Sequence, residues 1–181
     1  AVFVDRDGVV NEPVWDPRER AFESPYRPED VALVPGAAAG LRRARDAGYA
    51  LVLASNQPAA AKGTATREAL DAVHERVMEA LRMEGVRLDG VYYCHHHPDF
   101  TGPCECRKPA PGLLLRAARE LGLALRESWM IGDADTDLAA ARAAGARAVL
   151  VEHPRTAHRR TGAAADHVVP DLAAAAALIA P

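Results

Sequence analysis

The sequence has little of what would tie a protein to a membrane or to nucleic acid. None of its apolar runs approaches the ~20 residues that a membrane-spanning helix needs, and its first residues lack the pattern of a secretory signal. Its 22 Lys and Arg residues are outnumbered by 25 Asp and Glu residues, which leaves a formal net charge of −3. Because nucleic acids and anionic membranes usually bind basic surfaces, we expect neither as a partner. A small-molecule substrate is the better expectation.

Cysteine is also scarce, and all three residues, Cys94, Cys104 and Cys106, lie in one short segment. An odd number of cysteines so close together does not form a regular disulfide framework, so metal binding is the better interpretation. Thiols that bind a metal must stay reduced, and we therefore expect a cytoplasmic protein.

The length of 181 residues fits one domain with a sizeable core. No internal repeat and no linker interrupts the chain. We therefore expect a single domain over residues 1–181, a monomer, without a large cap domain.

Short apolar runs alternate with amphipathic stretches along the whole chain. Strands are expected at 1–4, 49–54, 91–93, 129–131, 148–151 and, more weakly, 167–169, and helices at 36–48, 66–84, 111–121, 135–144 and from 171. This alternation predicts an α/β fold with a doubly wound, mainly parallel, Rossmann-like sheet covered on both faces.

Residues 12–35 contain several prolines and show no sustained helical or strand period. We expect a long loop, and loops of this length in a small domain are usually functional. It would leave the end of the first strand and form one wall of a site. Its possible contacts are Trp15, Arg18, Arg20, Tyr26 and Arg27.

Polar side chains follow the predicted strands. Asp5 and Asp7 stand one residue apart directly after the first strand, and Gly8 lets the backbone turn away after them. Open α/β sheets bind ligands at the carboxyl ends of their strands, so we expect the polar groups of several strands to meet there. The other members are Ser55, Asn56 and Gln57 after the second strand, Lys108 before a helix, and Asp133 and Asp137 after the strand at 129–131.

These groups suit phosphoryl transfer. Asp5 can attack phosphorus as a nucleophile, and Asp7 can protonate the leaving alkoxide and then activate water. Two close carboxylates repel each other unless a cation lies between them, and Mg²⁺ prefers oxygen ligands. The expected magnesium ligands are Asp5, the main-chain carbonyl of Asp7, and Asp133, with Asp137 behind them. Ser55 and Lys108 would hold the phosphoryl oxygens.

The segment 94–106 offers three thiolates and an imidazole, enough for a tetrahedral Cys3His zinc site. In an extended chain Cys94 and His96 point the same way, as do Cys104 and Cys106, so His96 is the expected fourth ligand. Such a closed site is structural and would hold the segment that follows it beside the carboxylates. The alternative is three free cysteines in a flexible loop. We expect His95 and His97 to face solvent.

The heptapeptide at 5–11 (DRDGVVN), Ser55, Lys108 and the hexapeptide at 132–137 (GDADTD) together resemble the four motifs of the haloacid dehalogenase superfamily of aspartate-nucleophile phosphatases. The Cys-x-His…Cys-x-Cys-Arg-Lys-Pro pattern is similar to its capless, zinc-containing subfamily of D-glycero-D-manno-heptose 1,7-bisphosphate 7-phosphatases and histidinol-phosphate phosphatases. The resemblance implies magnesium-dependent hydrolysis of a small sugar phosphate, first of all a heptose bisphosphate. It also implies substrate contacts by Asn56, Gln57 and Arg107.

Three alternatives stay open at this point. Histidinol phosphate carries an amine, and a carboxylate in the pocket, such as Glu12, Asp16 or Glu19, would be needed to bind it. A phosphomutase would use the same motifs, although without a cap water should reach the intermediate. A zinc-stapled binding protein that has lost catalysis would keep the fold alone.

Overall fold

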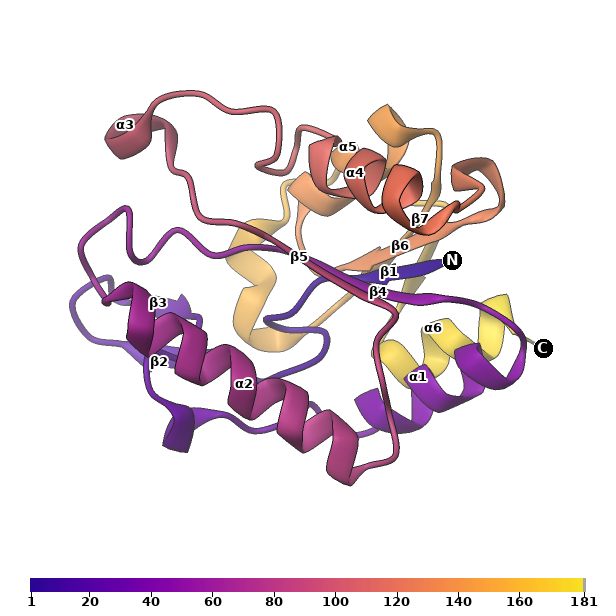
Figure 1. Cartoon of the computed structure of the whole chain (residues 1–181), viewed down its shortest axis with the longest axis horizontal. Coiled ribbons are helices and arrows are strands. Elements are labelled where there is room, and N and C mark those ends of the chain that lie inside the picture. Colours follow the sequence, from indigo (N-terminus) through magenta and orange to yellow (C-terminus); the bar gives the residue numbers. More distant parts are fainter. Residues whose placement is uncertain (181) are drawn as a thin grey trace.

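A six-stranded, wholly parallel sheet forms the centre of the computed structural model, which describes residues 1–180. Its strand order is β5-β4-β1-β6-β7-β8. The strands are β1 (Val2–Val4), β4 (Leu51–Asn56), β5 (Gly90–Cys94), β6 (Trp129–Gly132), β7 (Arg147–Val151) and β8 (His167–Val169). The chain winds outward from β1 in one direction and from β6 in the other, so the predicted doubly wound fold is confirmed (Figure 1). The switch point lies at the ends of β1 and β6.

Helices cover both faces of the sheet (Figure 1). One face carries α1 (Ala37–Asp46), α2 (Arg67–Met83) and α6 (Leu172–Ile179), and the other carries α4 (Gly112–Leu121) and α5 (Asp135–Ala144). Side chains alternate along a strand, so Val2 and Val4 pack toward the first group of helices and Phe3 toward the second. Burial on both faces explains why these strands appear in the sequence as continuous apolar runs.

Every strand and helix expected from the pattern is present, with ends that differ by no more than two residues. The main shift is in β4, which continues through Asn56, so that Ser55 belongs to the strand. The side chains of Ser55 and Asn56 therefore have the fixed direction of strand residues.

The segment 12–35 is a correction, because it is not the strandless loop that the sequence predicted. It contains an antiparallel hairpin of β2 (Val14–Asp16) and β3 (Ala21–Glu23), followed by the short 3-10 helix η1 (Pro28–Asp30). Trp15 pairs with Phe22 across the hairpin, ring edge against face, with centroids 5.4 Å apart. Three-residue strands are too short for a period to be recognised in the sequence.

Three other short elements had no sequence signal. They are α3 (Pro98–Thr101) inside the cysteine segment, η2 (Leu125–Glu127) before β6, and η3 (Pro154–Arg159) after β7. Of these, α3 and η3 matter for the site, because they lie in the segments that continue from the carboxyl ends of β5 and β7.

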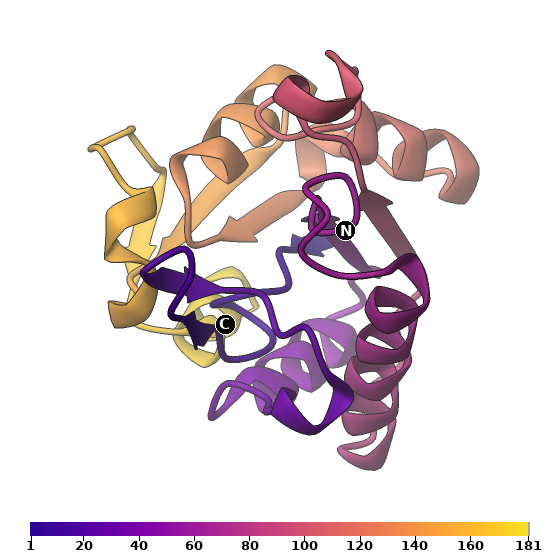
Figure 2. The same ribbon diagram turned by 90° about the vertical axis from the view of Figure 1, so that its left-hand side faces the viewer.

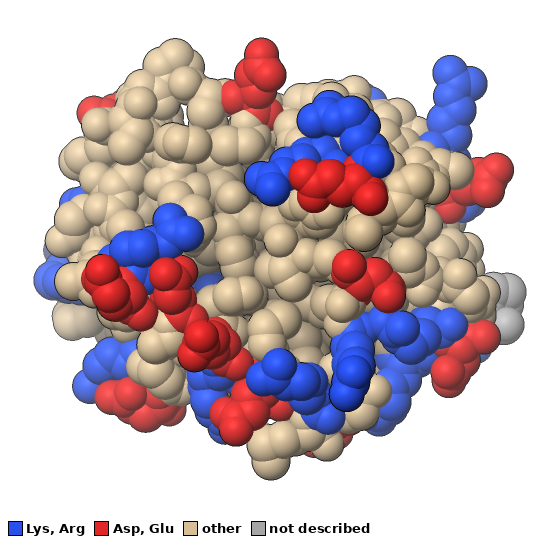
Figure 3. All heavy atoms as spheres, in the orientation of Figure 1, with Lys and Arg blue, Asp and Glu red and all other residues tan. Residues whose placement is uncertain are grey.

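The hairpin, the cysteine segment and η3 all gather at the carboxyl edge of the sheet, which faces the viewer in Figure 2. Lys and Arg side chains are mixed with Asp and Glu side chains on the face drawn in Figure 3, and neither charge dominates it. Within residues 1–180, no helix combines the length and the apolar character that crossing a bilayer would require.

Candidate active site and metal-binding segment

A cavity of about 430 Å³ opens at the carboxyl edge of the sheet. It lies over the switch point between β1 and β6, where open α/β sheets bind their ligands. Predicted site residues and residues with no sequence signal line it together. The lining is Asp5, Asp7, Glu23, Ser24, Asn56, Pro58, Lys62, His97, Arg107, Lys108, Pro109, Ala134, Thr136, His158 and Arg159.

Three buried carboxylates meet at the floor of this site. Asp5, Asp133 and Asp137 each place an oxygen within 4.8 Å of the others. Val4 pairs with Ile131 in the sheet, so Asp5 and Asp133 follow neighbouring strand ends. Asp137 comes from the first turn of α5, and its carboxylate accepts a hydrogen bond from the main-chain N–H of Ala134 at 3.1 Å.

Two glycines make this close approach possible. Gly8 has a φ of +86°, and a Cβ there would lie 2.3 Å from Asp133 Oδ2. At Gly132 a Cβ would lie 2.2 Å from the Cβ of Asp137. Any other residue at either position would push a carboxylate out of the cluster.

The carboxylate cluster has the properties of a cation site. Neither oxygen of Asp133 accepts a hydrogen bond within residues 1–180. Burial and the charges of Asp5 and Asp137 raise the pKa of Asp133 to about 8, and burial raises that of Asp137 to about 6 although Lys108 opposes the change. Buried oxygens without donors, held together against their repulsion, fit a hard divalent cation such as Mg²⁺.

Lys108 is buried beside the same carboxylates, with a relative exposure of 2%. Its ammonium lies 2.9 Å from Asp5 Oδ1 and 2.6 Å from Asp137 Oδ1, and it donates to the Ala54 carbonyl at 2.7 Å. Burial alone would lower the pKa of Lys108, but the charges of Asp137 and Asp5 raise it. The lysine is therefore a fixed cation.

Asn56 holds the main chain of Lys108 in place. Its side-chain nitrogen donates to the Lys108 carbonyl at 3.0 Å, and its oxygen accepts from the Lys108 N–H at 3.0 Å. This two-point contact joins β4 to the segment before α4. Since Asn56 also lines the cavity, its predicted contact with substrate stays open.

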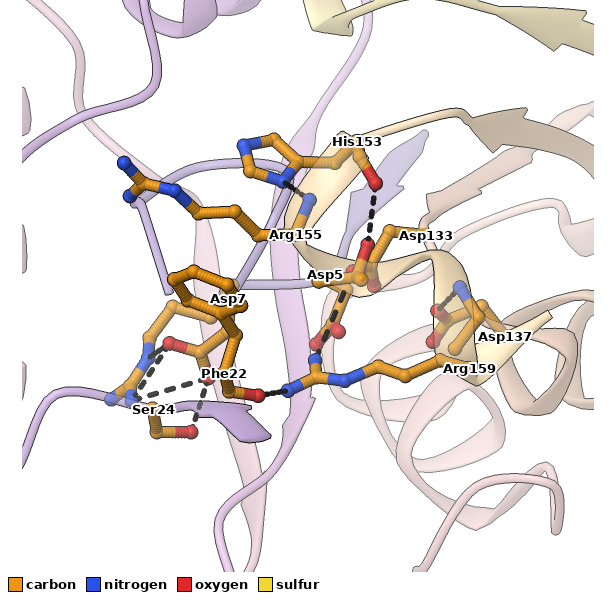
Figure 4. Close-up of polar contacts among 12 residues, drawn as sticks. Asp5, Asp7, Phe22, Ser24, Asp133, Asp137, His153, Arg155 and Arg159 are labelled. Atoms are coloured by element: carbon orange, nitrogen blue, oxygen red, sulfur yellow. Dashed lines mark hydrogen bonds and ion pairs between the residues drawn. The ribbon is translucent and has the colours of Figure 1, made fainter. Parts of the chain in front are cut away.

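Asp7 has a different environment from Asp5, although only Arg6 separates them. Its carboxylate accepts from Arg6 at 3.2 Å, from Asn11 at 3.0 Å and from Gln57 at 2.7 Å. It also accepts from the hydroxyl of Ser24 at 2.7 Å (Figure 4). Burial alone would raise the pKa of Asp7, but the Arg6 charge and the three neutral donors hold it below its ordinary value. The side chain of Arg6 is 1% exposed, and the sequence analysis assigned it no role.

The structure places Gln57 differently from the sequence prediction. Its side chain is 2% exposed, does not line the cavity, and donates to Asp7 and to Ser55 Oγ while accepting from Arg6. It therefore positions the carboxylate of Asp7 and not the substrate. Ser55 is buried at the end of β4, with its hydroxyl oriented by this amide.

The predicted contacts of the segment 12–35 are also corrected. Trp15, Arg18, Tyr26 and Arg27 line a separate pocket on the hairpin, and Arg20 lines neither. The wall of the site is made instead by Glu23 and Ser24 at the end of β3.

Of the carboxylates proposed for an amine substrate, none lines the cavity. Glu12 pairs with Arg155 at 3.0 Å and with His153 at 3.2 Å, Asp16 accepts from Arg18, and Glu19 lies 3.7 Å from Lys62. Glu23 is the acidic side chain of this segment that reaches the cavity.

Arg159 is the main site residue that the sequence did not indicate. It comes from η3, donates to the Phe22 carbonyl at 3.1 Å, and lies 3.8 Å from Asp133 Oδ2 (Figure 4). A basic residue in a short 3-10 helix carries no motif and no period, so no sequence signal points to it. The same holds for Ser24.

The cysteine segment brings its four predicted ligands together. The sulfur atoms of Cys94, Cys104 and Cys106 lie 3.1, 3.5 and 3.7 Å apart, and His96 Nδ1 lies 3.3 and 3.8 Å from two of them. A tetrahedral zinc ion with ~2.3 Å bonds to sulfur separates its sulfur ligands by about 3.8 Å, so the set fits Zn²⁺. All three cysteines are free thiols, and burial raises the pKa of Cys94 to about 12.

His95 and His97 do not both face solvent as predicted. His95 is half-buried and its ring Nδ1 contacts the Gln57 carbonyl at 3.2 Å. His97 lines the cavity and caps the first turn of α3. Arg107 also lines the cavity, and it donates to the His96 carbonyl at 3.1 Å. The cysteine segment and Arg107 after it therefore form one wall of the site.

Known proteins resemble the chain along most of its length. A family model described as HAD-hydrolase-like matches residues 105–175. D-glycero-beta-D-manno-heptose-1,7-bisphosphate 7-phosphatase of Yersinia pestis is 38% identical over 179 residues, covering 96% of this chain and 91% of that protein. D-glycero-D-manno-heptose-1,7-bisphosphate 7-phosphatase of Thermosynechococcus vestitus is 39% identical, covering 84% of this chain and 78% of that protein.

Solved structures give the same relationship. D,D-heptose 1,7-bisphosphate phosphatase from B. bronchiseptica, in complex with magnesium and phosphate, matches with a TM-score of 0.83 and 32% identity over 98% of this chain and 96% of that one. The corresponding phosphatase from Burkholderia thailandensis matches with a TM-score of 0.68 and 26% identity over 97% of this chain and 95% of that one. The motifs, the fold and these likenesses agree: the chain belongs to the D-glycero-D-manno-heptose-1,7-bisphosphate 7-phosphatase family of haloacid dehalogenase-like hydrolases.

Proposed function

We propose that this protein is a magnesium-dependent phosphatase that removes the 7-phosphate of D-glycero-D-manno-heptose 1,7-bisphosphate. Residues 1–181 would form one phosphatase domain with a zinc-binding segment at 94–106. The observation that carries the proposal is the contrast between Asp5, which faces the cation site and Lys108, and Asp7, which is held in a separate network. Two carboxylates in different environments are suited to two different roles.

Asp5, Asp133 and the main-chain carbonyl of Asp7 would hold Mg²⁺, and Asp137 would support them through its ion pair with Lys108. When bound, the ion neutralises the carboxylates and the phosphoryl oxygens, so that an anionic substrate can approach an anionic nucleophile. The unpartnered oxygens of Asp133 support this assignment.

In the first displacement an oxygen of Asp5 attacks the phosphorus of the 7-phosphate. The bond from phosphorus to the sugar oxygen breaks, and Asp7 donates a proton to the leaving alkoxide. The products are the free 7-hydroxyl and an aspartyl-phosphate on Asp5. Lys108, fixed against Asp5, counters the negative charge of the phosphoryl group that remains on Asp5.

In the second displacement Asp7 takes a proton from a water molecule that attacks the aspartyl-phosphate. The bond from phosphorus to Asp5 breaks and inorganic phosphate leaves. The donors around Asp7 favour its ionised form, which this step requires. In the first step the negative charge of the bound substrate phosphate would raise the pKa of Asp7, so that its carboxylate takes up a proton from solvent before it donates that proton to the alkoxide.

The remaining phosphate of the substrate would bind at the other wall of the cavity. Lys62, His97 and Arg107 line that wall together with Asn56. The guanidinium of Arg107 and the ammonium of Lys62 suit a sugar that carries a second phosphate. Histidinol phosphate is the second candidate because Glu23 lines the same cavity and could receive its amine.

Zn²⁺ would be held by Cys94, His96, Cys104 and Cys106. A closed set of four protein ligands leaves no position for substrate, so its role would be structural. Such thiolates require reducing conditions, which supports the cytoplasm as the compartment. The monomeric state expected from the sequence stays a prediction.

The test is phosphate release by the Asp5→Asn variant in the presence of magnesium. We expect no turnover, because the amide cannot form the aspartyl-phosphate, with the fold and the zinc content unchanged. Asp135→Asn is the matched control, since Asp135 lies in the same acidic helix turn as Asp137 but binds Thr161 outside the cavity. Turnover by Asp5→Asn at the wild-type rate would rule out the mechanism.

Substrate preference is tested by measuring kcat/KM of the wild-type enzyme for a panel of phosphate esters. We expect the heptose 1,7-bisphosphate to give the highest kcat/KM. A preference for histidinol phosphate would favour the second candidate, and equal rates across the panel would contradict both.

A further inference from the structure

We propose that Arg159 is a substrate-contacting residue that binds the oxygens of the phosphoryl group under attack. The inference rests on the phosphatase function proposed above and adds a cationic residue that no motif of the sequence contains.

The charge of Lys108 is already shared between two carboxylates of the cluster. Its ammonium lies 2.9 Å from Asp5 Oδ1 and 2.6 Å from Asp137 Oδ1, and it donates a hydrogen bond to the Ala54 carbonyl at 2.7 Å. The sequence predicted that this lysine holds phosphoryl oxygens, and it lines the cavity. A phosphate carries more negative charge than a lysine paired with two carboxylates can balance, so a second cation at the cavity would strengthen its binding.

Arg159 has donors that the protein leaves free. A guanidinium carries five N–H bonds, and within residues 1–180 its one hydrogen bond is to the Phe22 carbonyl, at 3.1 Å. Asp133 lies 3.8 Å away, beyond hydrogen-bond distance. The side chain is only 23% exposed and lines the cavity, so its remaining donors are directed toward the region that contains Asp5 and Asp7 (Figure 4).

The helix η3 holds Arg159 in this position. Thr156 is fully buried and its hydroxyl donates to the His153 carbonyl at 3.2 Å, while the His153 ring accepts from the main-chain N–H of Arg155 at 3.3 Å. Arg155 in turn pairs with Glu12. The element is therefore anchored to the segment that follows β1, and the Phe22 carbonyl at the hairpin fixes the end of the side chain.

Metal binding would favour the proposed contact. In the structure Asp133 attracts the guanidinium from 3.8 Å, and a cation bound to that carboxylate would weaken the attraction. The bond to Phe22 would stay, and the guanidinium would be available for phosphate. A planar guanidinium matches two oxygens of a phosphate at once, whereas an ammonium acts as a point charge.

A purely structural role, as counter-ion of Asp133, is the competing explanation, and binding measurements separate the two. Inorganic phosphate is titrated into wild-type protein and Arg159→Gln by calorimetry at saturating Mg²⁺, and Mg²⁺ is titrated alone. We expect phosphate affinity to fall about 10- to 100-fold in the variant, the range for hydrogen bonds to charged groups. Mg²⁺ affinity should be unchanged or higher, because a competing cation is gone.

Arg142→Gln is the matched control, since it removes the same charge at an exposed arginine that donates to the Ala164 carbonyl and does not line the cavity. It should bind phosphate like the wild type. Arg159→Lys keeps the charge without the fork and should bind phosphate with intermediate affinity, and this variant decides the matter if Arg159→Gln does not fold.

Wild-type phosphate affinity in both Arg159 variants would overturn the proposal, and so would a loss of Mg²⁺ affinity equal to the loss of phosphate affinity. Failure of the proposed function looks different. It would appear as wild-type protein that does not hydrolyse the heptose bisphosphate, whatever the phosphate affinities of the variants.

Discussion

Asp5 and Asp7 show how far two identical side chains can differ within one heptapeptide. Asp5 lies beside Lys108 and the other two carboxylates of the cluster. Asp7 turns toward Arg6 and neutral donors, including Ser24 after the hairpin. The turn at Gly8, which has a positive φ, brings Asn11 back to Asp7 as one of these donors.

Replacing Arg6 by glutamine should destabilise the protein at neutral pH by about 3–5 kcal/mol, because it leaves the buried carboxylate of Asp7 without its cation. In the wild type the pKa of Asp7 is below its ordinary value, so its ionisation stabilises the fold above about pH 4 and this contribution is lost as pH falls through the folded pKa. In the variant the buried carboxylate takes up a proton at higher pH. The difference in unfolding free energy should therefore shrink toward acid pH, as measured by urea denaturation at successive pH values.

The control for this experiment is Arg67→Gln, which breaks the ion pair with Asp71 on the surface of α2, where both side chains are more than half exposed. An exposed arginine of this kind should contribute about 0–1 kcal/mol. A difference between wild type and the Arg6 variant that does not depend on pH would contradict the role assigned to Arg6.

At the scale of elements, the cysteine segment links β5 to α4 and leads directly into Lys108. The last cysteine, Cys106, is followed directly by Arg107 and Lys108. At Gly112, in the first turn of α4, a Cβ would lie 2.2 Å from the Glu105 carbonyl, so the segment packs directly against the helix. Order in this segment and the position of Lys108 are therefore connected.

Cys106→Ser should remove the bound zinc, lower the melting temperature and reduce kcat together. The reason is that the loss of one ligand opens the closed site and frees the residues that follow it. Zinc content by elemental analysis, thermal unfolding and turnover are measured on the same preparation. His95→Gln is the control, because His95 contacts the Gln57 carbonyl and not the thiols, and it should keep its zinc. A zinc-free Cys106→Ser protein with wild-type kcat would separate the segment from catalysis.

At the scale of the whole molecule, the doubly wound topology creates the acidic site. The central position of β1 and β6 brings Asp5 and Asp133 to adjacent strand ends, although most of the chain separates them in sequence. Buried repulsion among these carboxylates is a cost to the fold that a divalent cation would remove. Stability, metal binding and pH should therefore be coupled.

Mg²⁺ should stabilise the protein more at pH 8 than at pH 6. The pKa of Asp133 is raised to about 8, so the metal-free fold loses stability through this group as pH rises from about 4 toward 8. Mg²⁺ binds the ionised form and offsets that loss, by about 2.7 kcal/mol at a concentration of 100 times its Kd. Melting temperatures with and without excess MgCl2 across this range test the coupling, with Asp133→Asn as the control that should not respond. Equal stabilisation at both pH values would contradict it.

The sequence by itself determined the parallel sheet, the two carboxylates after β1 and the spacing of the four clustered side chains of the cysteine segment. These features depend on local periodicity and on short fixed spacings, which the chain carries whatever its surroundings. Only the tertiary structure decided that Gln57 orients Asp7, that Lys108 lies against Asp5 and Asp137, and that Ser24 and Arg159 enter the site. The first two depend on contacts between residues far apart in the chain. The last two arise from a three-residue strand and a short 3-10 helix, which have too few residues to show a period.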